Sequence, residues 1–314
     1  MIYARKTVFI LFALMLLTIV NPAYPAEDGL DLRLNPERGK SYELEISVEQ
    51  QISQKSGDNL QELTQSLNMK YTFEKIDIDD EGYMNLKVIY NLLSFKQDGW
   101  MGKIDYDAAS VSENTHPMTR LLSAANSMSF NVKLSASGKV KSVDGNDALI
   151  SKVLDKIDVK EERERILMKG LLDDHFGEKA IKELIENKIF WYFPDKKIQK
   201  GDTWDKKIVM SDRYPMVIKS ICTLRDIKDR ECIIDVISHI GQNPEPVISP
   251  VDERRYFLAG NQSGELRIDE GSGWLKHGKL LQEFSGNVHI ENNKDKTRSA
   301  SFSVSVKKTI EFDG

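Results

Sequence analysis

The sequence predicts an α+β fold with two diverged antiparallel β-units, either curved sheets or half-barrels, and a helical insert between them. Long stretches alternate apolar and polar residues, as strands with one solvated face do. The middle of the chain instead spaces its apolar residues three and four apart, as helices do. A strand-opening pattern, a glycine followed three residues later by an aromatic residue, occurs at Gly39 and Tyr42 and again at Gly201 and Trp204. The predicted boundaries are a signal peptide at 1–26, a first β-unit at 27–145, a helical insert at 146–189 and a second β-unit at 190–314.

The N-terminus has the composition of a secretory signal peptide. Arg5 and Lys6 precede an apolar run at 8–20, and small residues follow up to Ala26. A run of about 13 residues is too short for a comfortable transmembrane helix. We therefore expect bacterial export to the periplasm or the medium, with cleavage after Ala26 or Ala23 and no stable membrane span afterwards. The alternative is an uncleaved membrane anchor.

In the first β-unit, period-two alternation predicts strands at 42–54, 67–76 and 84–92. The acidic segment 77–82 lies between the last two of these and predicts a hairpin turn. This segment resembles a calcium loop, but loop position twelve would be Val88, where such a loop needs glutamate. We therefore interpret it as a turn.

The helical insert is predicted from apolar spacing that recurs through 146–189 and fits about three short helices. A further short helix is expected at 117–126, before the last strands of the first β-unit. The run Asp173-Asp174-His175 offers three potential metal ligands, but adjacent helical residues point in different directions. We interpret the run as a helix C-terminus, with a metal site as the alternative.

The second β-unit opens with the run Phe190-Trp191-Tyr192-Phe193, the densest apolar feature after the signal peptide. We interpret this run as a strand or edge segment that covers the core; the alternative is an exposed groove or partner surface. Two hairpins are predicted to follow, 217–225 with 231–240 and 284–291 with 301–312. Because the spacing of the shared pattern differs between the two β-units, the repeat is a diverged duplication or a chance similarity of two β-rich halves.

The chain has two cysteines, Cys222 and Cys232. If the turn between them is centred on Ile227, they lie directly opposite each other on neighbouring strands, where Cβ atoms approach to about 4.5–5.5 Å. An oxidising compartment then permits a disulfide. The alternative is two buried thiols that pack as small hydrophobic residues.

Composition and motifs argue against several classes of function. The formal net charge is −5 and no basic stripe occurs, so nucleic-acid binding has no electrostatic basis. The five histidines are scattered, and no nucleophile elbow, phosphate-binding loop or dinucleotide fingerprint occurs. We therefore expect no catalytic activity, no metal and no cofactor, with a periplasmic hydrolase as the least favoured alternative.

Three segments of the chain carry a family resemblance. They are Gly39-x-x-Tyr42, the pattern Leu134-Ser135-x-x-Gly138-x-Val140-x-x-Val143-x-Gly145, and Phe193-Pro194-Asp195-Lys196 followed by Gly201-Asp202-Thr203-Trp204. In these segments the chain resembles a family of exported bacterial proteins that is catalogued only as a domain of unknown function, and the resemblance implies no catalytic residues. The expected architecture is also distantly similar to the half-barrels of periplasmic lipoprotein carriers, which shelter acyl chains in a concave sheet.

These observations predict an exported, non-catalytic envelope protein that binds an amphiphilic or hydrophobic ligand in a concave β-surface. Its expected partners are a lipid, another amphiphile or an envelope protein, and the alternative function is a structural or protein-interaction scaffold of the cell envelope. The candidate ligand-lining residues are Tyr71, Phe73, Tyr90, Leu92, Trp191, Trp204 and Trp274.

Overall fold

The computed structural model describes residues 29–110, 117–157, 161–210, 216–242, 247–248, 252–292 and 299–314. The predicted signal peptide lies outside these ranges. Among the helices within them, none has both the length and the apolar character needed to cross a bilayer.

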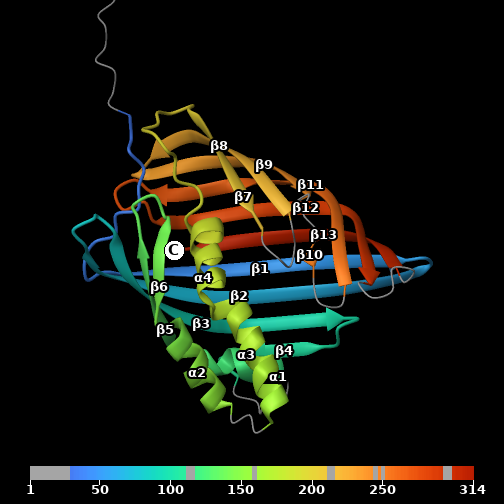
Figure 1. The fold of residues 1–314 in the computed structure, drawn as a ribbon. Helices are drawn as coiled ribbons and strands as arrows, with labels where there is room; N and C mark the ends of the chain where they lie inside the picture. Colours follow the sequence, from blue (N-terminus) through green and yellow to red (C-terminus); the bar gives the residue numbers. More distant parts are fainter. Residues whose placement is uncertain are drawn as a thin grey trace, which may run out of the picture.

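The described strands form one antiparallel sheet, in the order β6-β5-β3-β2-β1-β13-β12-β11-β9-β8-β7, with β4 paired to β3 and β10 paired to β11 (Figure 1). Their bounds are β1 Ser41–Ser56, β2 Asn59–Ile78, β3 Met84–Gly99, β4 Ile104–Asp107, β5 Met128–Leu134, β6 Val140–Asp144, β7 Thr203–Val209, β8 Met216–Lys228, β9 Glu231–Gln242, β10 Val247–Ile248, β11 Asp252–Asp269, β12 Leu275–Asn292 and β13 Ser299–Asp313.

The chain enters this sheet at its centre. Strands β1 to β6 step outward to one edge, all but one of the helices follow, and β7 to β13 step back from the opposite edge until β13 pairs with β1. The predicted antiparallel architecture is therefore confirmed, but the two β-units share one continuous sheet instead of forming two sheets. The physical reason is that β1 and β13 each present an unpaired edge within their own unit, and each satisfies the backbone hydrogen-bonding groups of the other. The duplication of the units is not confirmed.

The helices lie on one side of the sheet, and the later ones cross in front of β1 to β3 in Figure 1. Their bounds are α1 Pro117–Ala124, α2 Asn146–Lys156, α3 Glu162–Phe176, α4 Glu178–Glu183 and the π-helix η1 Leu184–Ile189. We call the side that they cover the inner face and the opposite side the outer face. Ring contacts bring this layer onto the sheet: Phe176 lies 5.1 Å from Tyr90, and Phe190 lies 5.9 Å from Phe73, between ring centroids.

The aromatic run that follows η1 is a turn rather than the predicted strand or edge segment. All four of its residues are buried, with exposed fractions of 7% or less. Side chains hold the turn, because Tyr192 donates its hydroxyl proton to the carbonyl of Gly273 at 3.0 Å and Trp204 Nε1 donates to the carbonyl of Tyr192 at 2.9 Å. The proline that follows has no N–H with which to continue a ladder.

A segment at residues 29–37, which we call the N-terminal strap, crosses one end of the sheet and joins three turns. Leu30 forms a β-bridge with Ile198. The backbone N–H of Leu34 donates to the carbonyl of Ala136 at 2.8 Å, and the N–H of Asn35 donates to the carbonyl of Ser272 at 2.7 Å.

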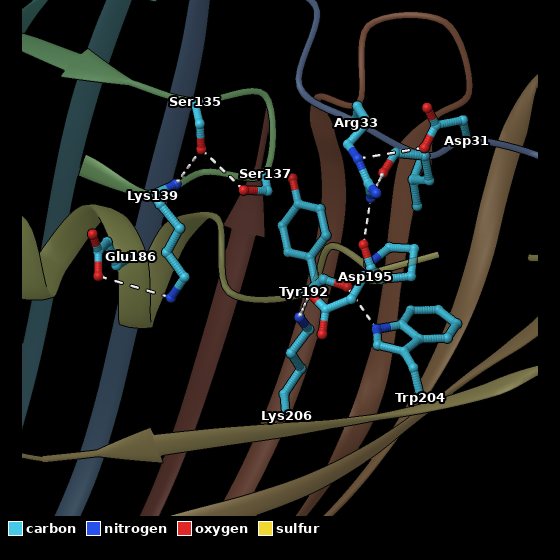
Figure 2. A network of polar contacts seen from close by, with 12 residues as sticks. Asp31, Arg33, Ser135, Ser137, Lys139, Glu186, Tyr192, Asp195, Trp204 and Lys206 are labelled. Atoms are coloured by element: carbon cyan, nitrogen blue, oxygen red, sulfur yellow. Dashed lines mark hydrogen bonds and ion pairs between the residues drawn. The ribbon is translucent and has the colours of Figure 1, made fainter. Parts of the chain in front are cut away.

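Side chains reinforce the strap on the aromatic turn. Figure 2 shows Arg33 reaching from the strap toward the segment that contains Asp195, and its guanidinium donates to the carbonyl of Pro194. Asp31 lies 3.4 Å from the same guanidinium, and Lys206 pairs with Asp195 at 3.1 Å. These contacts close the strap end of the inner face over the core.

Glycines in β11 and β12 allow the backbones of these two strands to approach closely. A Cβ on Gly264 would lie 1.9 Å from the carbonyl oxygen of Lys279, and one on Gly260 would lie 2.1 Å from that of Glu283. Neither distance leaves room for a side chain. Glycine at such positions is typical of a sheet that bends strongly, and Figure 1 shows β11 to β13 curving at one end.

Candidate functional site

The seven predicted ligand-lining residues are all buried, with exposed fractions between 0 and 7%. The structure brings four of them together, since Tyr71 lies 5.6 Å from Tyr90 and 6.3 Å from Phe73, and Phe73 lies 5.2 Å from Trp274, between ring centroids. Leu92 follows on the same face of β3 as Tyr90 and is fully buried. Burial raises the pKa of the Tyr71 and Tyr90 hydroxyls. These residues form the core beneath the strap and the helices.

Trp191 and Trp204 belong to the same core, on the side of β7. Trp204 is held by its hydrogen bond to the carbonyl of Tyr192. Neither tryptophan contributes to the two hollows described below.

Farther from the strap, the inner face carries a line of polar residues across nine neighbouring strands. Each residue in this line is the direct register partner of the next. We call the line the polar row; from β7 to β3 it consists of Lys206, Ser220, Ser238, Gln262, Gln282, Lys308, Gln50, Gln65 and Gln97.

One arm of the polar row is a hydrogen-bonded chain that is almost fully buried. Gln282 Nε2 donates to Gln262 Oε1 at 2.5 Å, Gln262 Nε2 donates to Ser238 Oγ at 3.0 Å, and Ser238 Oγ donates to Ser220 Oγ at 2.8 Å. All four residues have exposed fractions of 8% or less. Such a chain satisfies the polar groups that the sheet buries.

The other arm runs from Gln50 toward β3. Gln50 Nε2 donates to Gln65 Oε1, and Gln65 Nε2 donates to Gln97 Oε1 at 2.6 Å. Gln97 Nε2 lies 3.3 Å from the carbonyl oxygens of Met101 and Gly102. In both arms, therefore, the glutamine nearest the middle donates away from Lys308.

Lys308 stands between the two arms. Its side chain is half-buried, and within the described part of the chain it has no hydrogen-bond or ion-pair partner. Its ammonium still contacts solvent, since it is not among the buried polar atoms that lack a partner. Burial, and to a smaller extent the positive charge of Lys188, together lower the pKa of Lys308 to about 8.

Lys188 belongs to η1 and lies near enough to Lys308 for its charge to act on that lysine. Burial by the surrounding protein lowers its pKa as well, and the nearby carboxylate of Glu183 partly opposes this effect. The side chain is nevertheless exposed to water. Two lysine side chains therefore approach each other at the middle of the polar row, in a place that solvent can reach.

Apolar residues flank the polar row on both sides. Toward the strap, Ile310, Val48, Leu67 and Phe95 are successive register partners, and all four are half-buried against the core. We call these four residues the apolar strip. On the far side of the row, the corresponding positions are Phe284, Val306, Ile52 and Leu63. The inner face thus presents a polar line with a basic centre between two apolar lines.

Two hollows lie elsewhere on the sheet. The first, of about 470 Å³, is lined mainly by outward-facing charged residues that pair with one another, such as Lys279 with Glu311 at 2.7 Å and Arg267 with Glu265 at 2.8 Å. The second, of about 600 Å³, is lined by the polar-row residues from Gln97 to Gln282 and by their outward-facing chain neighbours. Because side chains alternate between faces, the outward-facing neighbours that make up most of this lining point away from the row.

The two cysteines are not opposite each other. The β8–β9 register pairs Cys222 with Val236 and Cys232 with Ile227, so the predicted facing geometry is wrong. Both thiols are free and fully buried, and burial raises the pKa of each to about 12. These properties are those of small hydrophobic residues.

The other predicted ligand candidates have local partners. In the acidic turn, Asp79 pairs with Lys133 at 2.5 Å and accepts the backbone N–H of Tyr83 at 2.8 Å. At the end of α3, Asp173 pairs with Lys169 at 2.6 Å, and His175 Nδ1 lies 2.8 Å from the carbonyl oxygen of Leu171. Neither segment, as described, gathers three metal-binding side chains.

Sequence reasoning missed the polar row, although its signal is present. In 44–52 the apolar phase of the alternation is interrupted by Gln50, and in 304–312 it is interrupted by Lys308. A polar residue in the apolar phase of one strand is unremarkable. The nine interruptions become a feature only when the register aligns them.

Comparisons with known proteins place the chain in a family. The model of a family of unknown function, DUF6263, matches residues 81–275. A solved structure described as lipid-protein interactions in lipovitellin is similar with a TM-score of 0.42 and 11% identity; the match covers 88% of this chain and 25% of that one. The chain thus spans about a quarter of that lipovitellin chain, and no curated protein matches it. Because the family match covers more than half of the residues, the protein is a member of the family of unknown function DUF6263.

Proposed function

We propose that this protein is an exported, non-catalytic binding protein that holds an amphiphilic or hydrophobic ligand against the inner face of its sheet. The observation that carries the proposal is the apolar strip beside the polar row, where four apolar side chains are only half-buried on the helix-covered side of the sheet. The seven residues that we expected to line the ligand are buried in the core beneath the strap, to one side of this surface.

The apolar strip fits an amphiphile better than a purely polar ligand. Val48 and Leu67 are direct register partners, and Ile310 and Phe95 continue the strip on either side. Covering such side chains removes apolar surface from water at about 25 cal/mol per Å². The polar row runs parallel to the strip, two residues away on each strand. It therefore offers hydrogen bonds to the polar end of an amphiphile whose alkyl chain covers the strip.

The test is ligand binding by matched serine variants. Leu67→Ser changes the apolar strip, and Leu281→Ser changes an outward-facing leucine that is 48% exposed. Delipidated protein would be titrated with a neutral single-chain amphiphile that carries a dansyl group. We expect Leu67→Ser to weaken binding about fivefold, because a half-buried leucine contributes about 1 kcal/mol of apolar contact. Leu281→Ser should bind as the parent protein does.

Absence of probe binding by the parent protein would refute the proposal, as would equal losses in the two variants. Circular dichroism and thermal unfolding of both variants would separate a lost contact from a lost fold. Native mass spectrometry of protein purified from its own compartment should show a co-purified lipid or other amphiphile.

A scaffold function is the second candidate, and one observation favours it. Ile221 and Ile237 are register partners on the outer face and are 51% and 68% exposed. An exposed apolar pair suits a protein contact. A photo-crosslinking residue at position 237 should then trap one defined envelope protein, and the same residue at His239, also exposed on the outer face, should not. Identical products at both positions would count against the scaffold.

A further inference from the structure

Lys308 is a cation in a setting that lacks its counterion. It is half-buried between two hydrogen-bonded arms, and within the described residues no hydrogen bond or ion pair reaches it. A charge withdrawn from water without a partner is costly. Another lysine of the row provides the contrast, since Lys206, at the end of the row, is paired with Asp195 at 3.1 Å. The middle of the row therefore holds an uncompensated positive charge.

Lys188 increases this charge instead of neutralising it. Its positive charge lowers the pKa of Lys308, and among the described residues the carboxylate of Glu183, on the preceding helix, only partly opposes the lowering of its own pKa. Two cations that approach each other on a partly buried surface favour an anion between them. Because Lys188 is exposed and the Lys308 ammonium contacts solvent, an anion can reach both.

The neighbouring glutamines can add hydrogen bonds to such an anion. Gln282 and Gln50 are the direct register partners of Lys308, and each uses one N–H of its amide in its own arm. A glutamine amide has a second N–H. Each amide therefore keeps one N–H that no described hydrogen bond uses.

The surroundings indicate what kind of molecule carries the anion. Val306 precedes Lys308 on the inner face of β13 by two residues, and Ile310 follows it by two, with Ile52 and Val48 beside them on β1. A small inorganic anion would use the lysines but would leave these apolar neighbours unused. A long alkyl chain attached to the anion would cover them.

We infer that the inner face contains a subsite for an anionic headgroup, with Lys308 and Lys188 as its cations, and that the ligand is an acidic amphiphile with a carboxylate or phosphate on an alkyl chain. This inference rests on the proposed function and specifies its ligand. Charge-assisted hydrogen bonds from two ammonium groups would supply the headgroup recognition, and the apolar strip would hold the chain.

The test compares headgroups on one chain length by calorimetric titration of the delipidated full-length mature protein. The probes are dodecanoate, dodecyl phosphate, the neutral ester monolaurin and inorganic phosphate alone. The variants are Lys308→Gln and Lys188→Gln, with Lys307→Gln as the matched control, because Lys307 is the outward-facing neighbour and its side chain is 67% exposed. Lys308→Gln also places a glutamine between two glutamines of the row, so the variant is suited to the fold.

We expect the parent protein and Lys307→Gln to bind the two acidic chains at least about tenfold more tightly than monolaurin, as one charge-assisted hydrogen bond allows. Lys308→Gln should reduce this preference to below about threefold and leave monolaurin binding unchanged. Lys188→Gln should reduce the preference in the same direction. Inorganic phosphate alone should bind far more weakly than dodecyl phosphate.

Several outcomes would overturn the inference, and they can be told apart. If monolaurin binds but the acids show no preference, or if Lys308→Gln weakens all chains equally, the headgroup subsite is refuted while the proposed function stands. If inorganic phosphate binds as tightly as dodecyl phosphate, the site recognises a free anion and the amphiphile is refuted. If no chain binds at all, the proposed function itself fails.

Discussion

Replacing Lys308 by glutamine should stabilise the folded protein near neutral pH. The pKa of this lysine falls from an ordinary 10.5 to about 8, first through burial and then through the charge of Lys188. Since one pKa unit corresponds to about 1.4 kcal/mol, the charged form costs the folded state about 3 kcal/mol. The ammonium keeps some contact with water, which reduces this cost, so we expect a gain of about 1–2 kcal/mol on its removal.

The same shift fixes the sign of the pH dependence. Because the pKa is lower in the folded state than in the unfolded chain, the unfolded chain binds more protons between pH 8 and 10.5. The penalty is fully present below pH 8 and fades as the pH rises toward 10.5. The stability of the parent protein should therefore approach that of Lys308→Gln across this interval.

The assay is urea unfolding followed by tryptophan fluorescence at pH 7 and pH 10, for the parent, Lys308→Gln and Lys307→Gln. The control removes the same charge from an exposed position, so the difference between the two variants isolates the inner-face lysine. The reasoning is refuted if Lys308→Gln is less stable than the control at pH 7, or if its advantage is the same at both pH values. A confirmed gain would mean that the protein retains a lysine that destabilises its fold. Residues at functional sites are often destabilising in this way.

Three further predictions concern other parts of the molecule. Gly264→Ala should lower the free energy of unfolding by about 3 kcal/mol, because the new Cβ would lie 1.9 Å from the Lys279 carbonyl oxygen. Gly170→Ala, in helix α3 with open space around it, should raise the free energy of unfolding by about 1 kcal/mol. Urea unfolding of both variants tests this contrast. Cys222 and Cys232 should resist a thiol reagent in the native protein and react fully in denaturant, because both thiols are buried. A reductant should leave the melting temperature of the protein unchanged. Fast labelling of the native protein would contradict the burial of the two thiols. Binding of dodecanoate should weaken as the pH rises from 8 to 10, because the anion needs the protonated form of Lys308, and binding of monolaurin over the same range should stay constant.

Local patterns were sufficient to predict several of the strands and the helical insert. The alternation around Leu44 and Tyr71 depends on neighbours two residues away, so it predicted β1 and β2 without knowledge of the sheet. Helical spacing likewise placed α2 to η1 in the insert. Alternation and helical spacing are properties of short segments, so they can be recognised in the sequence without knowledge of the tertiary structure.

The pairing register of neighbouring strands could not be predicted from the local sequence pattern. The prediction for Cys222 and Cys232 assumed a turn centred on Ile227. In the structure the turn residues are Asp229 and Arg230, both with positive φ, and a bulge lies between Leu224 and Asp226. A two-residue hairpin turn of this kind matches the twist of its strands, and each one-residue change of register exchanges the faces.

The sequence by itself determined the antiparallel strands, the helical insert, and the polar residues that interrupt the apolar phase at Gln50 and Lys308. Only the tertiary structure decided that β1 pairs with β13, which joins both units into one sheet, and that the interruptions align across nine strands. The physical reason is that alternation depends on the nearest residues along the chain, whereas the polar row depends on hydrogen bonds between strands that lie up to about 250 residues apart, as Gln50 and Lys308 do.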